Sequence, residues 1–209
     1  MTPSAILSEE LTAEARKTRA MIVSVAERHF KRYGYGKTTI VEIARDCAMS
    51  HANVYRFFRN KAELADAVAT LWLEKIVDVG KAALRRPGSA RERLVGLAVE
   101  LHRVKKRELL RTKNVYELLS LAESEGRPSI EAFQQHINAM YVEIIEDGRT
   151  RGEFHVADAR AAALVVQTAT VKFSHPLLVE QWQDHDLEPL LEEVMEIVAA
   201  GLASRRRSG

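Results

Sequence analysis

The stretch that decides the fold of this 209-residue chain is residues 38–64, TTIVEIARDCAMSHANVYRFFRNKAEL. Three helix starts fall close together within it. Thr39 and Glu42 have the spacing of a capping box, while Ser50 and Asn60 are residue types that favour the N-cap position. Short helices are marginal alone because nucleation is costly, so we expect these helices to be packed against one another.

The apolar spacing predicts how these helices pack. We expect helices over residues 16–33, 39–47 and 51–58 and a fourth from residue 60 onward, with the first ending at Gly34. The residues spaced to form their small shared core are Ile40, Ile43, Ala44, Met49, Val54 and Phe58. The groups left facing outward on the third helix are small, polar or cationic: His51, Ala52, Asn53, Tyr55 and Arg56. Two helices joined by a tight turn, the second presenting such groups, form a helix-turn-helix.

The distribution of charge supports a nucleic-acid-binding head. The whole chain carries 31 basic and 29 acidic residues, a net charge of +2 that indicates no particular partner. Residues 16–64, however, hold eleven basic and four acidic residues, a net charge of +7. The chain after Leu64 holds twenty basic and twenty-two acidic residues, a net charge of −2. The pattern predicts a basic DNA-binding module followed by a larger, slightly acidic body.

Four segments of the chain together resemble the DNA-binding domain of tetracycline-repressor (TetR) family regulators. They are residues 38–44, Met49-Ser50, residues 54–58 and residues 60–64. The composition and the helices read along the chain predict an all-α protein of about nine helices, which begins with a three-helix helix-turn-helix domain. Its expected domains are a helix-turn-helix domain at 14–74 and a helical effector-binding and dimerisation domain at 75–209. Two residues depart from the family pattern, since Ala48 and Ala52 stand where glycine is usual. A left-handed conformation at Ala48 is expected to cost about 1 kcal/mol.

The predicted DNA contacts surround the third helix. His51 and Asn53 are expected to reach base edges, and the free amides at the helix start to approach a phosphate. The resemblance implies that Tyr55 and Lys61 hold the DNA backbone and that Thr39 turns its hydroxyl or amide toward a phosphate. The complete predicted set is Thr39, Arg45, Ser50, His51, Ala52, Asn53, Tyr55, Arg56 and Lys61. The alternative is that Tyr55 is partly buried support and that the charged face is only solvated.

In the body we expect helices over 60–84, from Ser89 through Leu101, near 116–121, and over 128–148, 158–175 and 187–204. The resemblance implies that the last two pair with those of a second copy in a four-helix bundle. The predicted interface residues are Leu164, Thr168, Val171, Leu191, Val194 and Val198. The alternative is that these helices only close the core of the monomer.

The resemblance also implies a largely apolar effector pocket between the helices of the body. The candidate lining residues are Trp72, His102, Tyr116, Phe133, His136, Met140 and Phe173, although ordinary core packing explains each of them singly. No spacing places two of His102, His136 and His175 on one helix face, so no metal site and no cofactor are expected. Cys47 is expected to be a small buried residue.

The function expected from these features is a homodimeric repressor that binds a palindromic double-stranded operator and is released by a small, largely apolar effector. One alternative is a ligand-independent architectural protein or activator whose body serves dimerisation only. Another is an all-helical enzyme, but the sequence offers no nucleophile with a base, no phosphate loop and no paired carboxylates, so no enzymatic activity is expected. No run of about 20 apolar residues suits a membrane, and a cytoplasmic location is expected.

Overall fold

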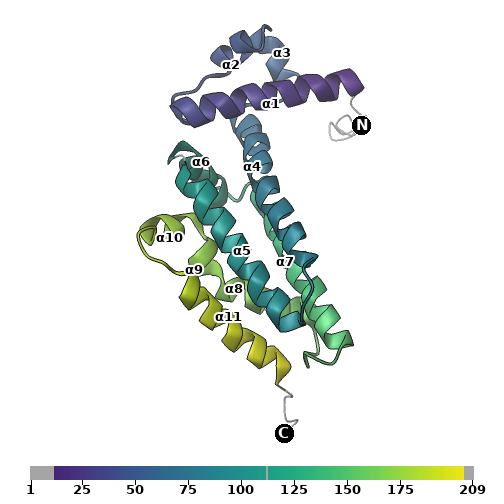
Figure 1. The fold of residues 1–209 in the computed structure, drawn as a ribbon. Coiled ribbons are helices and arrows are strands. Elements are labelled where there is room, and N and C mark those ends of the chain that lie inside the picture. Colours follow the sequence, from purple (N-terminus) through teal and green to yellow (C-terminus); the bar gives the residue numbers. More distant parts are fainter. Residues whose placement is uncertain (1–11, 112, 205–209) are drawn as a thin grey trace. The chain divides into compact units, whose positions relative to one another are not determined.

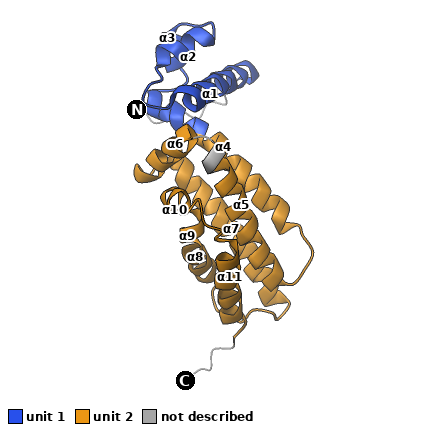
Figure 2. Ribbon diagram, turned by 60° about the vertical axis from the view of Figure 1, so that its left-hand side comes forward, with its two compact units in different colours: residues 1–68 blue, residues 69–209 orange. Residues whose placement is uncertain are grey.

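The computed structural model describes residues 12–111 and 113–204, which fold into two compact units divided between Val68 and Ala69 (Figures 1 and 2). Within these residues there are eleven helices and no strands, which confirms the all-α prediction. The assignment of DNA binding to residues 14–74 and of effector binding to residues 75–209 stays a prediction.

Unit 1 consists of α1 (Ala13–Tyr33), α2 (Ile40–Asp46), α3 (His51–Tyr55) and the first turns of α4 (Lys61–Leu84). These helices bury apolar residues at helical spacing, because one stripe of each turns inward. The fully or almost fully buried residues are Ile22, Ala26, Phe30, Ile43, Ala44, Val54, Phe58, Leu64, Ala65 and Val68. Such a shared core stabilises helices that are too short to persist alone.

Polar contacts fix where α1 ends and where α2 lies. Gly34 closes α1 with φ 82°, and its amide donates to the carbonyl of Phe30. The buried Thr38 hydroxyl donates to the carbonyl of Gly34 at 2.8 Å. At the other end of α2, Nε2 of the buried His29 lies 2.8 Å from Oδ2 of Asp46. These contacts tie both ends of α2 to α1.

The third helix is shorter than the predicted span 51–58, because α3 ends at Tyr55. The chain must turn before α4, and Asn60 caps the new helix by accepting from the amide of Glu63 at 2.8 Å. Phe58 remains buried in this turn, and its amide donates to the carbonyl of Val54 at 3.1 Å. The predicted core role of Phe58 therefore holds outside a helix.

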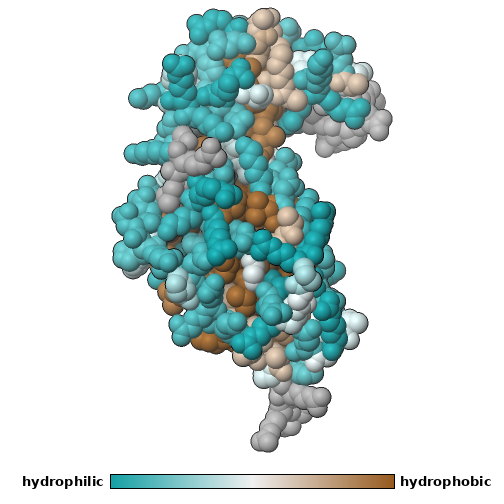
Figure 3. Space-filling view, in the orientation of Figure 1, coloured by the Kyte–Doolittle hydropathy of each residue, from teal (hydrophilic) through white to brown (hydrophobic). Residues whose placement is uncertain are grey.

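Unit 2 contains the rest of α4 and seven further helices. These are α5 (Ala90–Arg111), α6 (Lys113–Ser124), α7 (Pro128–Thr150), α8 (Ala159–Ala169), α9 (Val171–Ser174), α10 (Pro176–Gln181) and α11 (Glu188–Ala203). Helix α5 is the centre of the unit, because it packs against α6, α7, α9, α10 and α11 (Figure 1). Hydrophobic surface also shows between hydrophilic side chains on the face drawn in Figure 3.

The predicted number of helices, about nine, is too low for the described residues. The expected helix at 158–175 is broken at Thr170, whose hydroxyl donates to the carbonyl of Gln167 at 2.9 Å, and α9 follows as a single turn. A further short helix, α10, begins at Pro176, which cannot continue the preceding helix but suits a first turn. Sequence spacing alone did not reveal these breaks.

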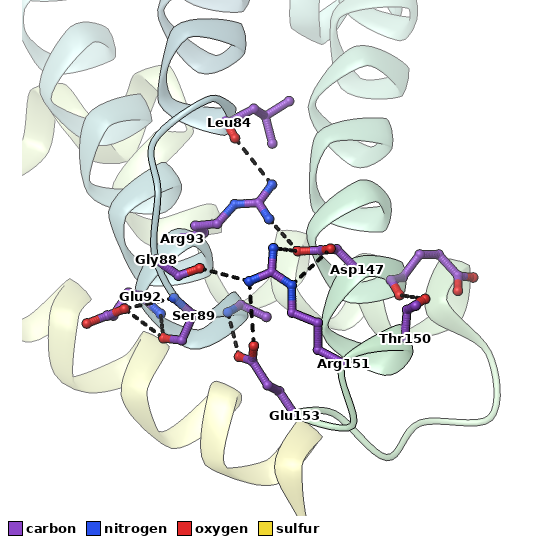
Figure 4. Close-up of polar contacts among 11 residues, drawn as sticks. Leu84, Gly88, Ser89, Glu92, Arg93, Asp147, Thr150, Arg151 and Glu153 are labelled. Atoms are coloured by element: carbon purple, nitrogen blue, oxygen red, sulfur yellow. Dashed lines mark hydrogen bonds and ion pairs between the residues drawn. The ribbon is translucent and has the colours of Figure 1, made fainter.

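A polar cluster at one end of unit 2 joins α4, α5 and α7 (Figure 4). Arg93 donates to a carboxylate oxygen of Asp147 at 2.5 Å and to the carbonyl of Leu84 at 3.2 Å. Arg151 lies 2.8 Å from the same carboxylate and donates to the carbonyl of Gly88 at 3.1 Å. Since the Arg93 side chain is mostly buried, these charge-assisted bonds offset its desolvation.

The same end of the unit has a close approach that only glycine allows. A Cβ atom at Gly148 would lie 2.5 Å from the ring of Phe154 and 2.7 Å from the Cβ of Ala90. The amide of Ala90 donates to Glu153 at 2.6 Å, which holds this contact closed. The segment after α7 is therefore pressed against the start of α5.

We expect Gly148→Ala to lower the free energy of unfolding of the full chain by about 1–3 kcal/mol, because the neighbouring atoms must move apart. Gly96→Ala is the matched control, since a Cβ at Gly96 in α5 meets nothing within 4 Å. That control should raise stability by up to about 1 kcal/mol through its higher helix propensity. Urea unfolding monitored by circular dichroism measures both; equal effects of the two substitutions would contradict the close-packing account.

Candidate DNA-binding surface and effector cavity

The turn between α2 and α3 has the geometry of a Schellman motif. The amide of Met49 donates to the carbonyl of Ala44 at 3.0 Å, and the amide of Ala48 donates to that of Arg45 at 3.0 Å. These two bonds satisfy carbonyls at the end of α2 and require a left-handed residue between them. Ala48 supplies it with φ 54°, and is the only described non-glycine residue with positive φ. The conformation considered for Ala48 from the sequence is thus present.

The start of α3 is open to solvent. Ser50 is its N-cap, as predicted, and its hydroxyl accepts from the amide of Asn53 at 3.3 Å. The side chains of His51, Ala52 and Asn53 are exposed, and Tyr55 is 48% exposed. The rings of His51 and Tyr55 meet edge to face at 6.3 Å between centroids. One exposed turn therefore brings together five of the nine predicted contact residues.

Thr39 begins α2 with the predicted capping box. Its hydroxyl and its amide both donate to Oε2 of Glu42, at 2.8 Å and 2.9 Å, and its hydroxyl accepts from the amide of Glu42 at 3.3 Å. These bonds from Thr39 lower the pKa of the Glu42 carboxyl group. Because both donors are engaged, a phosphate contact by Thr39 requires exchange of the Glu42 carboxylate for the phosphate.

The predicted cationic contacts differ in their surroundings. Arg45 and Arg56 are exposed, and Arg45 approaches Asp46 at 3.4 Å. Lys61, in contrast, is half-buried with its ammonium 4.3 Å from the centroid of the Tyr35 ring. Burial lowers the pKa of Lys61. Local sequence patterns do not link Tyr35 to this lysine, because the two residues lie 26 positions apart.

The last helices present exposed apolar side chains at several of the predicted interface positions. Helices α8 and α11 pack together in unit 2. Of the predicted interface residues, Leu164, Thr168 and Val171 are exposed, while Val194 and Val198 are partly exposed. Other large apolar side chains exposed on these two helices are Val165, Leu190 and Ile197.

The prediction that Leu191 lies in the subunit interface is wrong. Leu191 is completely buried in unit 2 and cannot reach a partner subunit from there. It lies on the inward stripe of α11 together with Met195, Ala199 and Leu202. The sequence prediction mixed the two faces because both stripes of α11 are apolar. Its outward stripe includes Leu190 and Ile197 instead.

A cavity of about 130 Å³ lies within unit 2, between α4 and the helices that follow it. Its wall is mostly aliphatic and aromatic. The polar or ionisable lining residues are His102, Lys105, Glu123, Gln134, Tyr141, Gln167, Thr170, Ser174 and His175. Gln134 and Val171 are exposed as well as lining the cavity, so the cavity reaches the surface near them.

Three of the seven predicted pocket residues, His102, Phe133 and Phe173, line this cavity together. His102 is held there by Nδ1, which lies 2.8 Å from the carbonyl of Phe173. The other four do not line it. Trp72 and Tyr116 are buried elsewhere in the unit, His136 is exposed, and Met140 packs beneath Gly80.

The residue that sequence reasoning missed is Lys105. It is 9% exposed and lines the cavity, although lysine is rarely buried. A signal was present, because Leu94, Ala98 and Leu101 form the buried stripe of α5 and Lys105 continues it at the i+4 position. A charged residue on an otherwise apolar stripe is a candidate for function.

Two further findings concern the described part of the chain as a whole. None of its helices is both long and apolar enough to cross a membrane. Nor do three or more His, Cys, Asp or Glu side chains gather there in an arrangement suited to a metal ion. Cys47 is buried, as expected for a small apolar residue.

A capped helix-turn-helix followed by a helical unit with a cavity defines a DNA-binding regulator of transcription. Comparison with known families identifies which one. The family model described as bacterial regulatory proteins, tetR family, matches residues 22–68, and the model of the tetracyclin repressor-like C-terminal domain matches residues 90–195. The chain belongs to the tetR family of transcriptional regulators, which confirms the resemblance seen in its sequence.

Individual relatives share parts of the chain. It is 42% identical over 55 residues to the HTH-type transcriptional regulator TtgR of Pseudomonas putida, and this match covers 26% of each chain. The matched part therefore spans about a quarter of that relative. An uncharacterized HTH-type regulator of Bacillus subtilis, YhgD, is 23% identical over 148 residues, covering 71% of this chain and 78% of the relative.

Solved structures show the same fold at low identity. FadR from Bacillus subtilis, solved in complex with stearoyl-CoA, is 18% identical with a TM-score of 0.64, and the match covers 87% of this chain and 98% of FadR. The TetR family regulator PfmR from Thermus thermophilus is 19% identical with a TM-score of 0.56, and covers 88% and 99%.

We expect Ala48→Gly to raise the free energy of unfolding by about 1 kcal/mol, because glycine adopts the left-handed conformation without a Cβ penalty. Ala52→Gly, four residues away in the first turn of α3, should lower it by about 0.5–1 kcal/mol. Thermal unfolding of the full chain compares the two. Destabilisation by both substitutions would show that Ala48 is not strained.

Proposed function

We propose that the chain is a homodimeric repressor that binds a palindromic operator and is released when a small, largely apolar effector binds unit 2. The observation that carries the proposal is the exposed first turn of α3, which presents His51, Asn53 and Tyr55 together on a helix held by a capped turn. Such a turn suits the major groove, where side chains at a helix start meet base edges.

The surface of unit 1 divides into base-reading and phosphate-binding groups. His51 and Asn53 carry donors and acceptors and have no aliphatic stem long enough to reach past the groove, so we assign them to base edges. We assign Tyr55, Arg45 and Lys61 to phosphates. The net charge of +7 over residues 16–64 adds affinity for DNA that does not depend on the base sequence.

A palindromic operator requires two copies related by a two-fold axis, with half-sites about one helical turn apart. The apolar side chains exposed on α8 and α11 supply a surface for this pairing. Leu164 and Ile197 are 57% and 67% exposed, and apolar side chains exposed together on neighbouring helices are typical of protein–protein interaction sites. We assign these two helices to a four-helix interface between subunits.

The cavity in unit 2 favours effector control over a ligand-independent role. A body that served dimerisation alone would have no use for a cavity of about 130 Å³ that reaches the surface. The similar protein FadR was solved with stearoyl-CoA, a ligand with a long apolar chain. Release from DNA follows if the effector binds the state with lower DNA affinity more tightly.

A gel-shift titration of the purified protein with its own upstream DNA, at moderate salt, tests the proposal. We expect a discrete complex that competitor DNA of unrelated sequence does not displace at equal concentration. Absence of such a complex at protein concentrations up to the micromolar range would contradict the proposed repressor function.

We expect Asn53→Ala to reduce discrimination at one operator position by about 1–3 kcal/mol, because it removes contacts to a base edge. Tyr55→Phe should instead weaken binding to all operator variants to a similar degree, since only a phosphate contact is lost. Fluorescence anisotropy with single-base operator variants separates the two patterns. Equal loss on every variant for Asn53→Ala would remove Asn53 from the base-reading group.

We expect Leu164→Asp to make the protein monomeric and to raise its dimer dissociation constant at least about 100-fold, because a carboxylate would be buried without a partner. The matched control is Leu177→Asp, since Leu177 in α10 is 56% exposed but outside α8 and α11. Sedimentation equilibrium measures both. A monomer with the control substitution as well would place the interface elsewhere.

A further inference from the structure

The cavity of unit 2 contains a charge that the rest of the protein does not neutralise at close range. Lys105 comes from the central helix α5 and is surrounded by aliphatic and aromatic lining residues. Among the described residues its ammonium has no hydrogen-bond acceptor and no carboxylate within ion-pair distance. The ring of Phe133 lies beside the ammonium, with its centroid 5.0 Å away. Lysine is rarely this buried, so a lysine side chain in the wall of a largely apolar cavity points to a function there.

The carboxylate that lines the same cavity as Lys105, that of Glu123, already has another partner. Glu123 of α6 lines the same cavity, but its Oε1 lies 3.5 Å from Nε2 of His175. The charge of Glu123 acts on Lys105 only through space. Up to three ammonium protons of Lys105 therefore remain for a molecule that enters the cavity.

Resting on the proposed effector-binding role of unit 2, we infer that its ligand is a small monocarboxylic acid whose carboxylate pairs with Lys105 while its apolar body fills the cavity. The lining supplies both halves of this recognition, since Leu101, Ile137 and Phe173 contact the body and Lys105 the charge. A cavity of about 150 Å³ in another protein holds one benzene molecule, so about 130 Å³ suits a body of roughly six carbon atoms.

The ionisation of Lys105 agrees with this assignment. Burial lowers the pKa of Lys105 to about 8, against the opposing effect of Glu123. The ammonium form thus predominates at pH 7 and is lost above pH 8, whereas a carboxylic acid with a pKa of about 4 stays ionised throughout. The other titratable groups lining the cavity are Glu123 from α6, His102 from α5, Tyr141 from α7 and His175 at the start of α10. Burial raises the pKa of Tyr141, so it stays neutral over this range.

The test uses three probes of nearly equal shape and different charge: benzoate, benzamide and benzylamine. Chemical-shift titrations of the full chain at pH 7 give their dissociation constants. We expect benzoate to bind at least about tenfold more tightly than the other two, since a buried charge-assisted bond is lost with each. At pH 9.5 the benzoate affinity should fall toward that of benzamide. Hexanoate in the same titration distinguishes an aliphatic from an aromatic body.

Lys105→Met provides the decisive variant, because it keeps the length of the side chain and removes the charge. It should lose the preference for benzoate over benzamide and melt at a higher temperature than the original protein, as a desolvated charge has been removed. Lys106→Met is the matched control on the same helix, since Lys106 donates to the carbonyl of His185 at 2.9 Å and does not line the cavity. It should keep the preference.

Equal binding of benzoate and benzamide, tighter binding of benzylamine, no binding of any probe, or an unchanged preference in Lys105→Met would each overturn the inference. A parallel gel shift separates this outcome from failure of the proposed function. Benzoate that binds through Lys105 without altering DNA affinity would leave the carboxylate site standing and contradict effector-controlled release. DNA release by a neutral ligand alone would support effector-controlled release and contradict the carboxylate site at Lys105.

Discussion

Helices α2 and α3 have seven and five residues, too few to persist in water. The proposed DNA-binding surface exists only because both helices are fixed at their ends and packed on α1. The Thr39–Glu42 capping box starts α2, the bonds around Ala48 end it, and Ser50 starts α3. His29 and Asp46 add a polar tie to α1. The geometry that unit 1 offers to DNA is therefore set by caps and core contacts, not by helix propensity.

Unit 2 is organised around α5. The side chains of this helix contribute both to the packing of the unit and to the wall of its cavity. At the start of α5, Arg93 joins the ends of α4 and α7 through Leu84 and Asp147. About three turns further along, the same helix places Lys105 against the cavity. A helix that contacts five others has few exposed positions, and Lys105 is buried because it lies on the inward stripe with Leu94, Ala98 and Leu101. Under the proposed effector-binding role, the charge of Lys105 selects for a ligand with an anionic group.

Much of unit 1 could be predicted, because its determinants are local. Capping residues, glycine at the end of α1 and apolar spacing act within a few residues of one another, so a single sequence displays them. Even the conformation of Ala48 could be anticipated from its place in the turn. The boundaries in unit 2 were less accessible. Thr170 ends α8 with ψ 0° within a continuous apolar pattern. Leu191 and Leu190 are chemically equivalent until the fold turns one of them inward.

The sequence by itself determined the all-helical class, the helix-turn-helix, the family and the concentration of positive charge in residues 16–64. Each of these depends on residue type and short-range spacing. Only the tertiary structure decided which apolar stripe of α11 is exposed, which three of seven candidate residues share a cavity, and that Lys105 faces it without an ion pair. These properties depend on residues far apart in the chain, such as Lys105, Phe133 and His175, whose proximity no local pattern encodes.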